Sequence, residues 1–378
     1  MSEKIPKEWK WVKLGEVADV RDGTHDSPKE AIDGKYLITS KHIKNGKIDF
    51  SKAYKISLDD FEAINKRSKV DKYDILFSMI GTIGEMVIVD FEPDFAIKNV
   101  GLFKTGNKDL SRWIYYYLKS NDAQAEIYAS LKGSTQQYIT LGDLRNFPIL
   151  LPPLPEQKAI VEVLSSIDDK IDLLHRQNKT LEEMAMTLFR QWFIEPTKDG
   201  LPEGWEEVSL GEIIEISSGK SIEKGKLKEK GLYPVLGANG EIGRTDDWLY
   251  EGELIYTGRV GTLGNVFIVF RNEKVWLTDN TLVIKPKKNE YFYFVYFTLK
   301  NAKLDEYNSG STQPLIRQSD IKKIEIFLPK INFLKDFEVI SRNLFTKIQF
   351  NTSQIQTLDK LRDTLLPKLM SGELRVKV

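Results

Sequence analysis

The sequence contains the same ordered blocks twice. The matched blocks are Pro-x-x-Trp at Pro6 and Pro202, Gly-Thr-x-Gly at Gly81 and Gly261, and Gly-Ser-Thr-Gln at Gly133 and Gly310. Self-similarity over this distance indicates a duplicated structural unit. The matched blocks lie furthest apart in the first pair, and their separation shrinks along the chain. The first copy is therefore expected to carry an extra stretch in its early loops, and surface loops are where specificity usually resides.

Length and composition limit what such a duplicated chain can be. The 378 residues suffice for two or three domains, and 41% apolar with 29% charged residues is typical of a soluble globular protein. The absence of cysteine excludes disulfides, cysteine nucleophiles and thiolate zinc sites, and with three histidines a metal centre is not expected. No segment approaches the ~18 apolar residues of a membrane span, and the N-terminus begins no signal core. We expect a cytoplasmic protein without a membrane partner.

Each copy is followed by a stretch in which apolar residues recur at alternating steps of four and three. This spacing is typical of coiled-coil helices. Because one chain holds two such helices, they most economically pair with each other. The predicted seam residues are Ile160, Leu164, Ile167, Ile171, Leu174, Asn178, Leu181, Leu188, Leu344, Ile348, Asn351, Ile355, Leu358 and Leu365.

The two seam asparagines favour an antiparallel pair. With the helix ends aligned, antiparallel pairing places Asn178 opposite Asn351, whereas parallel pairing places Asn178 opposite Ile355. An amide buried against an apolar side chain loses hydrogen bonds at a cost of roughly 1 to 3 kcal/mol, while two facing amides satisfy each other. Pro367 removes an interior hydrogen bond and could end the second helix early.

Within each copy the pattern predicts a mixed α/β fold. Apolar runs at 74–78 and 253–257 precede glycine turns and indicate strands. The aromatic segments 111–118 and 291–299 are predicted to be helices packed into the cores rather than base-stacking platforms, because they recur at equivalent places. The predicted architecture is a pseudo-symmetric duplicated protein, with globular domains at 1–152 and 196–329 and long antiparallel coiled-coil helices at 153–195 and 330–378.

Signals for catalysis are poor. Gly219-Lys220-Ser221 resembles the end of a phosphate loop, but position 214, where the pattern requires glycine, is Ile214. The Gly-Thr turns lack dinucleotide-binding spacing and are interpreted as tight turns between strands. No Asn-Pro-Pro-aromatic methyltransferase motif is present, and nothing marks a Ser-His-Asp triad. We expect a chain that is not an enzyme and holds no metal or cofactor of its own.

DNA contact has a better physical basis. Although 55 basic residues balance 55 acidic ones, lysines gather in clusters, and segments 36–47 and 233–244 place polar side chains directly after apolar runs. Arg259 lies between glycines, where a backbone can approach closely. For each lysine a solvated face is the alternative, for His42 a hydrogen-bonding role in its loop, and for the Ser-Thr-Gln groups a helix cap. The predicted DNA contacts are Thr39, Ser40, Lys41, His42, Lys44, Lys47, Ser78, Thr82, Ser134, Thr135, Gln136, Lys220, Asn239, Arg244, Thr257, Arg259, Thr262, Ser311, Thr312 and Gln313.

Taken together these motifs resemble a known family. The paired Pro-x-x-Trp and Gly-Ser-Thr-Gln blocks are joined by Leu-Pro-Pro-Leu-Pro-Glu-Gln at 151–157 and by a closing Leu-Leu-Pro-Lys-Leu-Met-Ser-Gly-Glu-Leu at 365–374. Their order is similar to that of the DNA specificity subunit of type I restriction-modification systems, over essentially the whole chain. The segment at Pro329 departs from the family pattern, because it lacks the Pro-Leu-Pro-Glu-Gln sequence that opens the first helix.

The resemblance implies two target recognition domains, each reading half of a bipartite target in double-stranded DNA. The differing loop sequences of the two copies predict that this target is asymmetric. The resemblance also implies as partners two modification subunits, which bring S-adenosylmethionine and methylate adenine, and restriction subunits, which use ATP and Mg. The helices would act as a ruler, since a rod from Ile160 to Trp192 spans roughly 48 Å. Two rival interpretations remain: a coiled-coil scaffold that binds proteins without DNA specificity, and a hydrolase with a deep pocket and a perturbed carboxylate or histidine.

Overall fold

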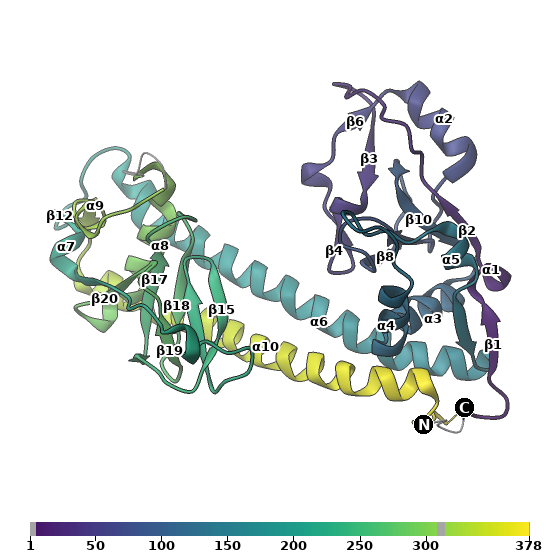
Figure 1. Ribbon diagram of the computed structural model, residues 1–378. Coiled ribbons are helices and arrows are strands. Elements are labelled where there is room, and N and C mark those ends of the chain that lie inside the picture. The colour runs from purple at the N-terminus through teal and green to yellow at the C-terminus, as the bar shows by residue number, and fades with distance from the viewer. Residues whose placement is uncertain (1–4, 308–313, 378) are drawn as a thin grey trace. The chain divides into compact units, whose positions relative to one another are not determined.

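The computed structural model of the protein describes residues 5–307 and 314–377 and consists of two compact units (Figure 1). Unit 1 comprises Met1–Leu173 with Gln354–Val378, and unit 2 comprises Leu174–Ser353. Each unit contains one globular copy together with a stretch of each of two long helices. No helix among the described residues is long and apolar enough to cross a membrane.

Unit 1 is built around an antiparallel four-stranded sheet. Its strands, in spatial order, are β2 (Asp19–Asp22), β10 (Val100–Lys104), β7 (Ile75–Ser78) and β8 (Met86–Ile88). Beside it are a sheet of β6 (Lys55–Ile56), β3 (Lys35–Thr39) and β9 (Phe95–Lys98), the hairpin β4 (Ile43–Lys44) and β5 (Lys47–Ile48), and the pair β1 (Lys10–Lys13) and β11 (Pro148–Leu151). The helices are α1 (Leu14–Val17), α2 (Leu58–Ser68), α3 (Lys108–Lys119), α4 (Asn121–Ala129) and α5 (Leu141–Arg145).

Unit 2 repeats this plan. Its central sheet has the order β13 (Ile214–Ser218), β20 (Thr281–Pro286), β17 (Leu254–Gly258) and β18 (Val266–Val269). A second sheet holds β15 (Gly240–Thr245), β14 (Tyr233–Gly237), β19 (Lys274–Leu277) and β16 (Tyr250–Glu251), and β12 (Glu206–Ser209) pairs with β21 (Glu325–Leu328). The helices are α7 (Leu210–Ile213), α8 (Phe292–Asn301) and α9 (Gln318–Lys322).

The shared topology confirms the predicted duplication. In both central sheets the strand that comes first in the chain pairs with the strand that comes last, β2 with β10 and β13 with β20. The parallel pair of β3 and β9 in unit 1 likewise corresponds to the parallel pair of β14 and β19 in unit 2. The extra stretch predicted for the first copy contains α2, which lies between β6 and β7 and starts at the cap Ser57. Unit 2 has strands β15 and β16 in the corresponding interval. The copies therefore differ in the segments that decorate a common sheet.

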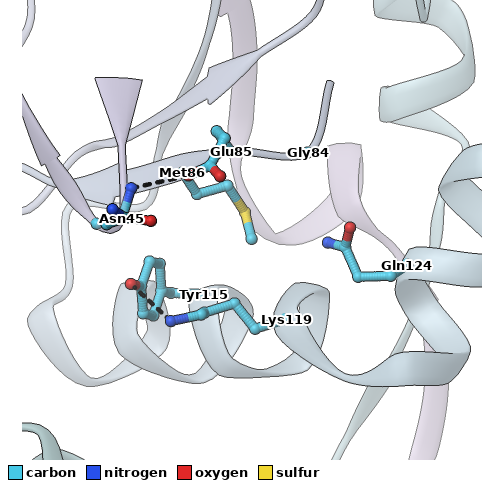
Figure 2. Close-up of a pocket in the computed structure, with 8 residues that line it drawn as sticks. Asn45, Gly84, Glu85, Met86, Tyr115, Lys119 and Gln124 are labelled. Carbon is cyan, nitrogen blue, oxygen red and sulfur yellow. Dashed lines mark hydrogen bonds between the residues drawn. The ribbon is translucent and has the colours of Figure 1, made fainter. Parts of the chain in front are cut away.

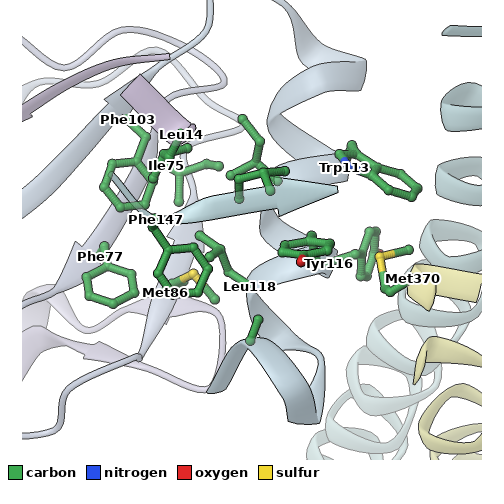
Figure 3. Close-up of a cluster of buried hydrophobic side chains, with 14 of the residues drawn as sticks. Leu14, Ile75, Phe77, Met86, Phe103, Trp113, Tyr116, Leu118, Phe147 and Met370 are labelled. Atoms are coloured by element: carbon green, nitrogen blue, oxygen red, sulfur yellow. The ribbon is translucent and has the colours of Figure 1, made fainter. Parts of the chain in front are cut away.

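The aromatic segments predicted to be core helices are core helices. In unit 1, α3 contributes Trp113 and Tyr116 to a continuous apolar cluster that also contains Phe77, Phe103 and Met370 (Figure 3). In unit 2, nearly all of α8 is buried, from Phe292 to Phe297. Burial of these rings removes them from solvent, so they cannot serve as stacking platforms for bases.

Two long helices, α6 (Leu154–Phe189) and α10 (Ile331–Ser371), contain all the predicted seam residues, each buried or half-buried. In unit 2, the amide of Asn351 donates to Oδ1 of Asn178 at 2.9 Å, which confirms the predicted facing of these side chains. Further along, Phe189 packs against Phe337, so the helices run antiparallel within this unit. In unit 1, Arg362 of α10 forms an ion pair with Asp168 of α6, with Nη1 and Oδ1 3.1 Å apart, so a charged contact also joins the two helices.

Pro367 does not end the second helix early. Helix α10 continues through it to Ser371. Leu366, Leu369 and Met370 are all at least nine-tenths buried in the core of unit 1. Their packing offsets the single hydrogen bond that proline removes from the last turns.

Candidate nucleic-acid interface

The Gly-Thr block of unit 1 forms the turn of the hairpin β7–β8, as the tight-turn interpretation predicts. Gly81 and Gly84 have φ of 82° and 91°, a backbone region that favours glycine. Ser78 Oγ donates to the carbonyl of Ile80 at 3.3 Å, and this buried hydroxyl helps to fix the turn. Thr82, at the tip, is exposed.

The Gly-Ser-Thr-Gln block of unit 1 is a closed loop between α4 and α5. Its base is fastened by reciprocal backbone hydrogen bonds between Lys132 and Tyr138, both 2.9 Å. Gly133 has φ +90°, and a Cβ there would lie 2.4 Å from the carbonyl oxygen of Gln136. This crowding leaves no room for another residue at Gly133. The side chains of Ser134, Thr135 and Gln136 are exposed and do not cap a helix.

The turn and the loop, which are far apart in sequence, lie against each other. Ile80 and Tyr138 form a β-bridge, and the amide of Ile139 donates to the carbonyl of Met79 at 3.2 Å. In unit 2, Val260 and Leu315 form the corresponding bridge. Ser311, Thr312 and Gln313 lie outside the described residues, but the residues that follow them are bonded to the turn: Gly261 N donates to Pro314 O at 3.0 Å, and Ile316 N donates to Arg259 O at 2.9 Å.

A third segment, an Asn-Gly hairpin tip, joins the turn in each unit. In unit 1 the amide of Asn45 donates to Glu85 Oε2 at 3.0 Å (Figure 2). In unit 2 the side chain of Asn265 donates to Asn239 Oδ1 at 2.8 Å. Glu85 and Asn265 occupy the same position of the two copies, because each directly follows the last glycine of its Gly-Thr-x-Gly block. The turn–loop edge of unit 1 is the turn, the loop and the tip together, and that of unit 2 is the turn, residues 314–316 and the tip.

The sequence predictions missed half of this third segment. They included Asn239 but neither Asn45 nor its partner Glu85. The signal was available, because Asn45-Gly46 matches Asn239-Gly240 and an Asn-Gly dipeptide favours a two-residue hairpin turn. Asn45 has φ 51°, as such a turn requires.

A cavity of about 250 Å³ in unit 1 adjoins this edge (Figure 2). Its lining includes the tip residue Asn45, the turn residue Gly84, and Tyr115, Lys119 and Gln124 from α3 and α4. The ammonium group of Lys119 lies 3.2 Å from the hydroxyl of Tyr115 and 4.9 Å from the centre of its ring. A cation therefore lies beside the segments predicted to meet DNA.

Four predicted DNA contacts are buried and are corrected here. His42 is fully buried: its Nδ1 accepts from the amide of Thr39 at 3.0 Å, its Nε2 lies 3.2 Å from the carbonyl of Lys52, and burial lowers its pKa. This is the hydrogen-bonding role considered as the alternative. Ser40, Ser78 and Thr257 are at most 8% exposed and bond to backbone carbonyls. None of the four can reach a phosphate or a base edge from these positions.

Other predicted contacts lie at the surface, and some of their side chains are held by neighbouring residues. Arg244 is held by Glu241 at 3.0 Å and by the carbonyls of Gly231 and Leu232, and Lys47 pairs with Asp172 at 2.6 Å. By contrast, Arg259 forms no ion pair with any residue that the structure describes, although its backbone is fixed by Asn280 at 2.8 Å. The remaining exposed or half-exposed side chains are Thr39, Lys41, Lys44, Thr82, Lys220, Asn239 and Thr262. In residues 5–307 and 314–377, no group of three histidine, aspartate or glutamate side chains could hold a metal.

Comparison with known proteins shows the family to which the sequence is similar. The sequence model described as "Type I restriction modification DNA specificity domain" matches residues 6–183 and again residues 202–358. The chain is 28% identical to the type I restriction enzyme MjaIX specificity subunit of Methanocaldococcus jannaschii, over 99% of this chain and 95% of that protein. It is 23% identical to the HindI specificity subunit of Haemophilus influenzae, over 82% of this chain and 88% of that protein.

The fold has a counterpart among solved structures. A crystal structure of a type I restriction-modification system S subunit from M. genitalium has a TM-score of 0.61 and 20% identity, and the match covers 98% of this chain and 97% of that one. Because the family's domain matches most of the sequence, and does so once in each copy, the chain belongs to the type I restriction-modification DNA specificity family.

Proposed function

We propose that each unit reads one half of a bipartite, asymmetric double-stranded DNA target through its turn–loop edge. The observation that carries this proposal is the convergence, in both units, of three segments that are far apart in sequence. The edge of unit 1 presents Thr82, Ser134, Thr135 and Gln136 as hydrogen-bonding side chains, and that of unit 2 presents Asn239, Arg259 and Thr262. Side chains of these types read base edges and hold phosphates. Arg259 of unit 2 takes the position that Met79 holds in unit 1, two residues before the Gly-Thr block, so the two half-sites should differ.

The chain would act as the specificity subunit, and chemistry would come from partners. In this proposal modification subunits, two per complex, bring S-adenosylmethionine and methylate adenine, and restriction subunits bring ATP and Mg. The equal numbers of basic and acidic residues, 55 each, support a subunit that shares phosphate contacts with its partners. Binding of the isolated chain to DNA would then be weak and sensitive to salt.

We further propose that the long helices determine the unread spacer between the half-sites. Insertion of one heptad into each of α6 and α10, at facing positions, adds about 10 Å per helix and keeps the seam in register. We expect methylation to move to targets with a longer spacer and unchanged half-sites. Methylation that persists at the original spacing would contradict the ruler.

Sequencing of methylated adenines in cells that carry the partner genes tests the readout. We compare the wild-type chain with Arg259→Gln and with the matched control Arg271→Gln, whose arginine is exposed beyond the end of β18. Loss of an arginine that contacts a base edge should cost about 1 to 3 kcal/mol of discrimination and relax one position of one half-site. The control should keep the original target. An unchanged target in Arg259→Gln would remove this residue from the proposed readers.

A further inference from the structure

Unit 2 contains a cavity beside its core helix α8. Its volume is about 310 Å³, and it is bounded by α8, by β21 and by the segment that follows α6. The lining includes Phe189, Phe193, Phe294, Thr298, Ile326 and Phe327. The walls are thus mainly aromatic, and Asn301 and Glu325 add polar atoms.

The duplication shows what fills the equivalent place in unit 1. Helices α3 and α8 are aligned by the Leu-Lys pair that both contain, at Leu118 and Leu299. This alignment pairs Trp113 with Phe294 and Tyr117 with Thr298. In unit 1 both aromatic side chains are buried, Trp113 completely and Tyr117 to 8% exposure.

The unit 1 side chains also show the chemistry of the occupant. The indole Nε1 of Trp113 donates to the carbonyl of Leu150 on β11 at 3.1 Å. When the strands are aligned from the preceding Gly-Ser-Thr-Gln blocks, the matching residue on β21 is Phe327, which is 37% exposed where Leu150 is 3% exposed. Unit 2 therefore has the same shell of strand and helix with a smaller side chain at both filling positions and a wall that is open to solvent.

We propose that this cavity of unit 2 binds a small planar aromatic molecule of the size of indole that carries an N–H or O–H donor. The ring would take the place that the indole of Trp113 and the phenol of Tyr117 occupy in unit 1. Aromatic walls favour edge-to-face contacts with such a ring, and a volume of about 300 Å³ is at the lower end of known ligand pockets. Neither DNA nor the turn–loop edge enters into this assignment.

Titration of the full-length chain with indole, followed by calorimetry, tests the proposal. The wild-type chain should bind indole at one saturable site. Thr298→Tyr, which copies the unit 1 side chain, should weaken the binding at least tenfold, about 1.4 kcal/mol. The matched control Thr180→Tyr places the same ring on an exposed helical position of unit 2 and should bind as the wild type does.

A reciprocal variant tests the same idea from the other unit. Tyr117→Thr should create a cavity in unit 1 and add a second saturable site for indole. If this variant does not fold, the comparison of Thr298→Tyr with Thr180→Tyr still shows whether the cavity of unit 2 binds indole. No saturable binding by the wild type, or equal binding by Thr298→Tyr, would overturn the proposal. Methylation specificity is not involved, so the outcome is independent of the proposed readout of DNA.

Discussion

Trp9 and Trp205 occupy the same place in the two units, but different chemistry holds them. In unit 1 the indole Nε1 of Trp9 donates to Glu156 Oε2 at 2.9 Å. Glu156 is 3% exposed, and its carboxylate also accepts from the guanidinium of Arg375. The start of the chain, the start of α6 and the segment after α10 are therefore joined through one buried carboxylate.

In unit 2 the position that matches Glu156, aligned from the same Gly-Ser-Thr-Gln blocks, is Phe333. Trp205 packs against Phe333 and Phe193, with ring centroids 6.3 and 6.2 Å apart. The Pro-Leu-Pro-Glu-Gln sequence that contains the carboxylate in unit 1 is missing there, and the helix begins at Ile331 without it. The comparison teaches that the shared scaffold tolerates either anchor. A polar anchor fails as a whole when one partner is lost, whereas aromatic contacts are lost in part.

Removal of the buried carboxylate should show the largest difference in stability between the two anchors. Glu156→Ala leaves the buried N–H of Trp9 without its acceptor, at an expected cost of about 3 kcal/mol. The matched Phe333→Ala removes a half-exposed ring and should cost about 1 kcal/mol. Urea denaturation followed by tryptophan fluorescence measures both. Equal losses of stability would mean that the hydrogen bonds of the carboxylate contribute no more than the contacts of the Phe333 ring.

The core helices offer a second test of the comparison. Trp113→Phe copies the unit 2 residue into unit 1, where it leaves a void and an unpaired carbonyl, and should cost about 2 kcal/mol. Phe294→Trp makes the opposite change next to an existing cavity and should change stability by less than about 1 kcal/mol. Denaturant midpoints of the two variants give the contrast. A large loss in Phe294→Trp would show that the cavity of unit 2 cannot accept an indole.

The repeat accounts for how much of the fold could be predicted. Matched blocks revealed the duplication, and heptad spacing located both long helices, because periodicity reports directly which face of a helix is buried. Asn178 and Asn351 even gave the direction of the pair. The aligned blocks place Phe333 at the position of Glu156, but the sequence does not show that these side chains meet Trp205 and Trp9.

The candidate site was predictable only in its parts. The turn and loop motifs were found as sequence blocks, but their convergence depends on the bridge between Ile80 and Tyr138, which no local pattern contains. Ser78 and Thr257 were predicted to contact DNA. They are at the ends of strands in which every residue is buried, and both hydroxyls bond to backbone carbonyls instead.

The asparagine pair of unit 2 should determine register more than stability. Asn351 is fully buried, and its Oδ1 has no hydrogen-bond partner among the described residues. Asn178→Leu alone should cost about 2 kcal/mol, since it leaves the buried amide of Asn351 with only the long 3.5 Å contact from its Nδ2 to Gln177 Oε1. The double change Asn178→Leu, Asn351→Leu should recover this loss and raise the free energy of unfolding by about 1 kcal/mol above that of the wild type. The two helices should then no longer be fixed in a single register. Thermal unfolding measures stability, and cysteine crosslinking between facing helix positions measures register. A double variant weaker than either single change would contradict this assignment.

The smallest expected effect is a pH dependence at the base of the Gly-Ser-Thr-Gln loop of unit 1. A hydrogen bond from Lys132 at 2.8 Å, assisted by one from Thr140, holds the pKa of Asp143 below its ordinary value. A carboxyl group whose pKa is lower in the folded state stabilises the fold above its ordinary pKa, and this contribution is lost as the pH falls through the lowered pKa. Because Lys132 also closes the loop through Tyr138, the loop should open in that acidic range. Hydrogen-exchange protection of residues 132–138, corrected for intrinsic rates, should fall there in the wild type and in the control Asp122→Asn, whereas Asp143→Asn should show low protection at every pH. Protection that stays constant in the wild type would show that the reciprocal backbone bonds close the loop without the ion pair.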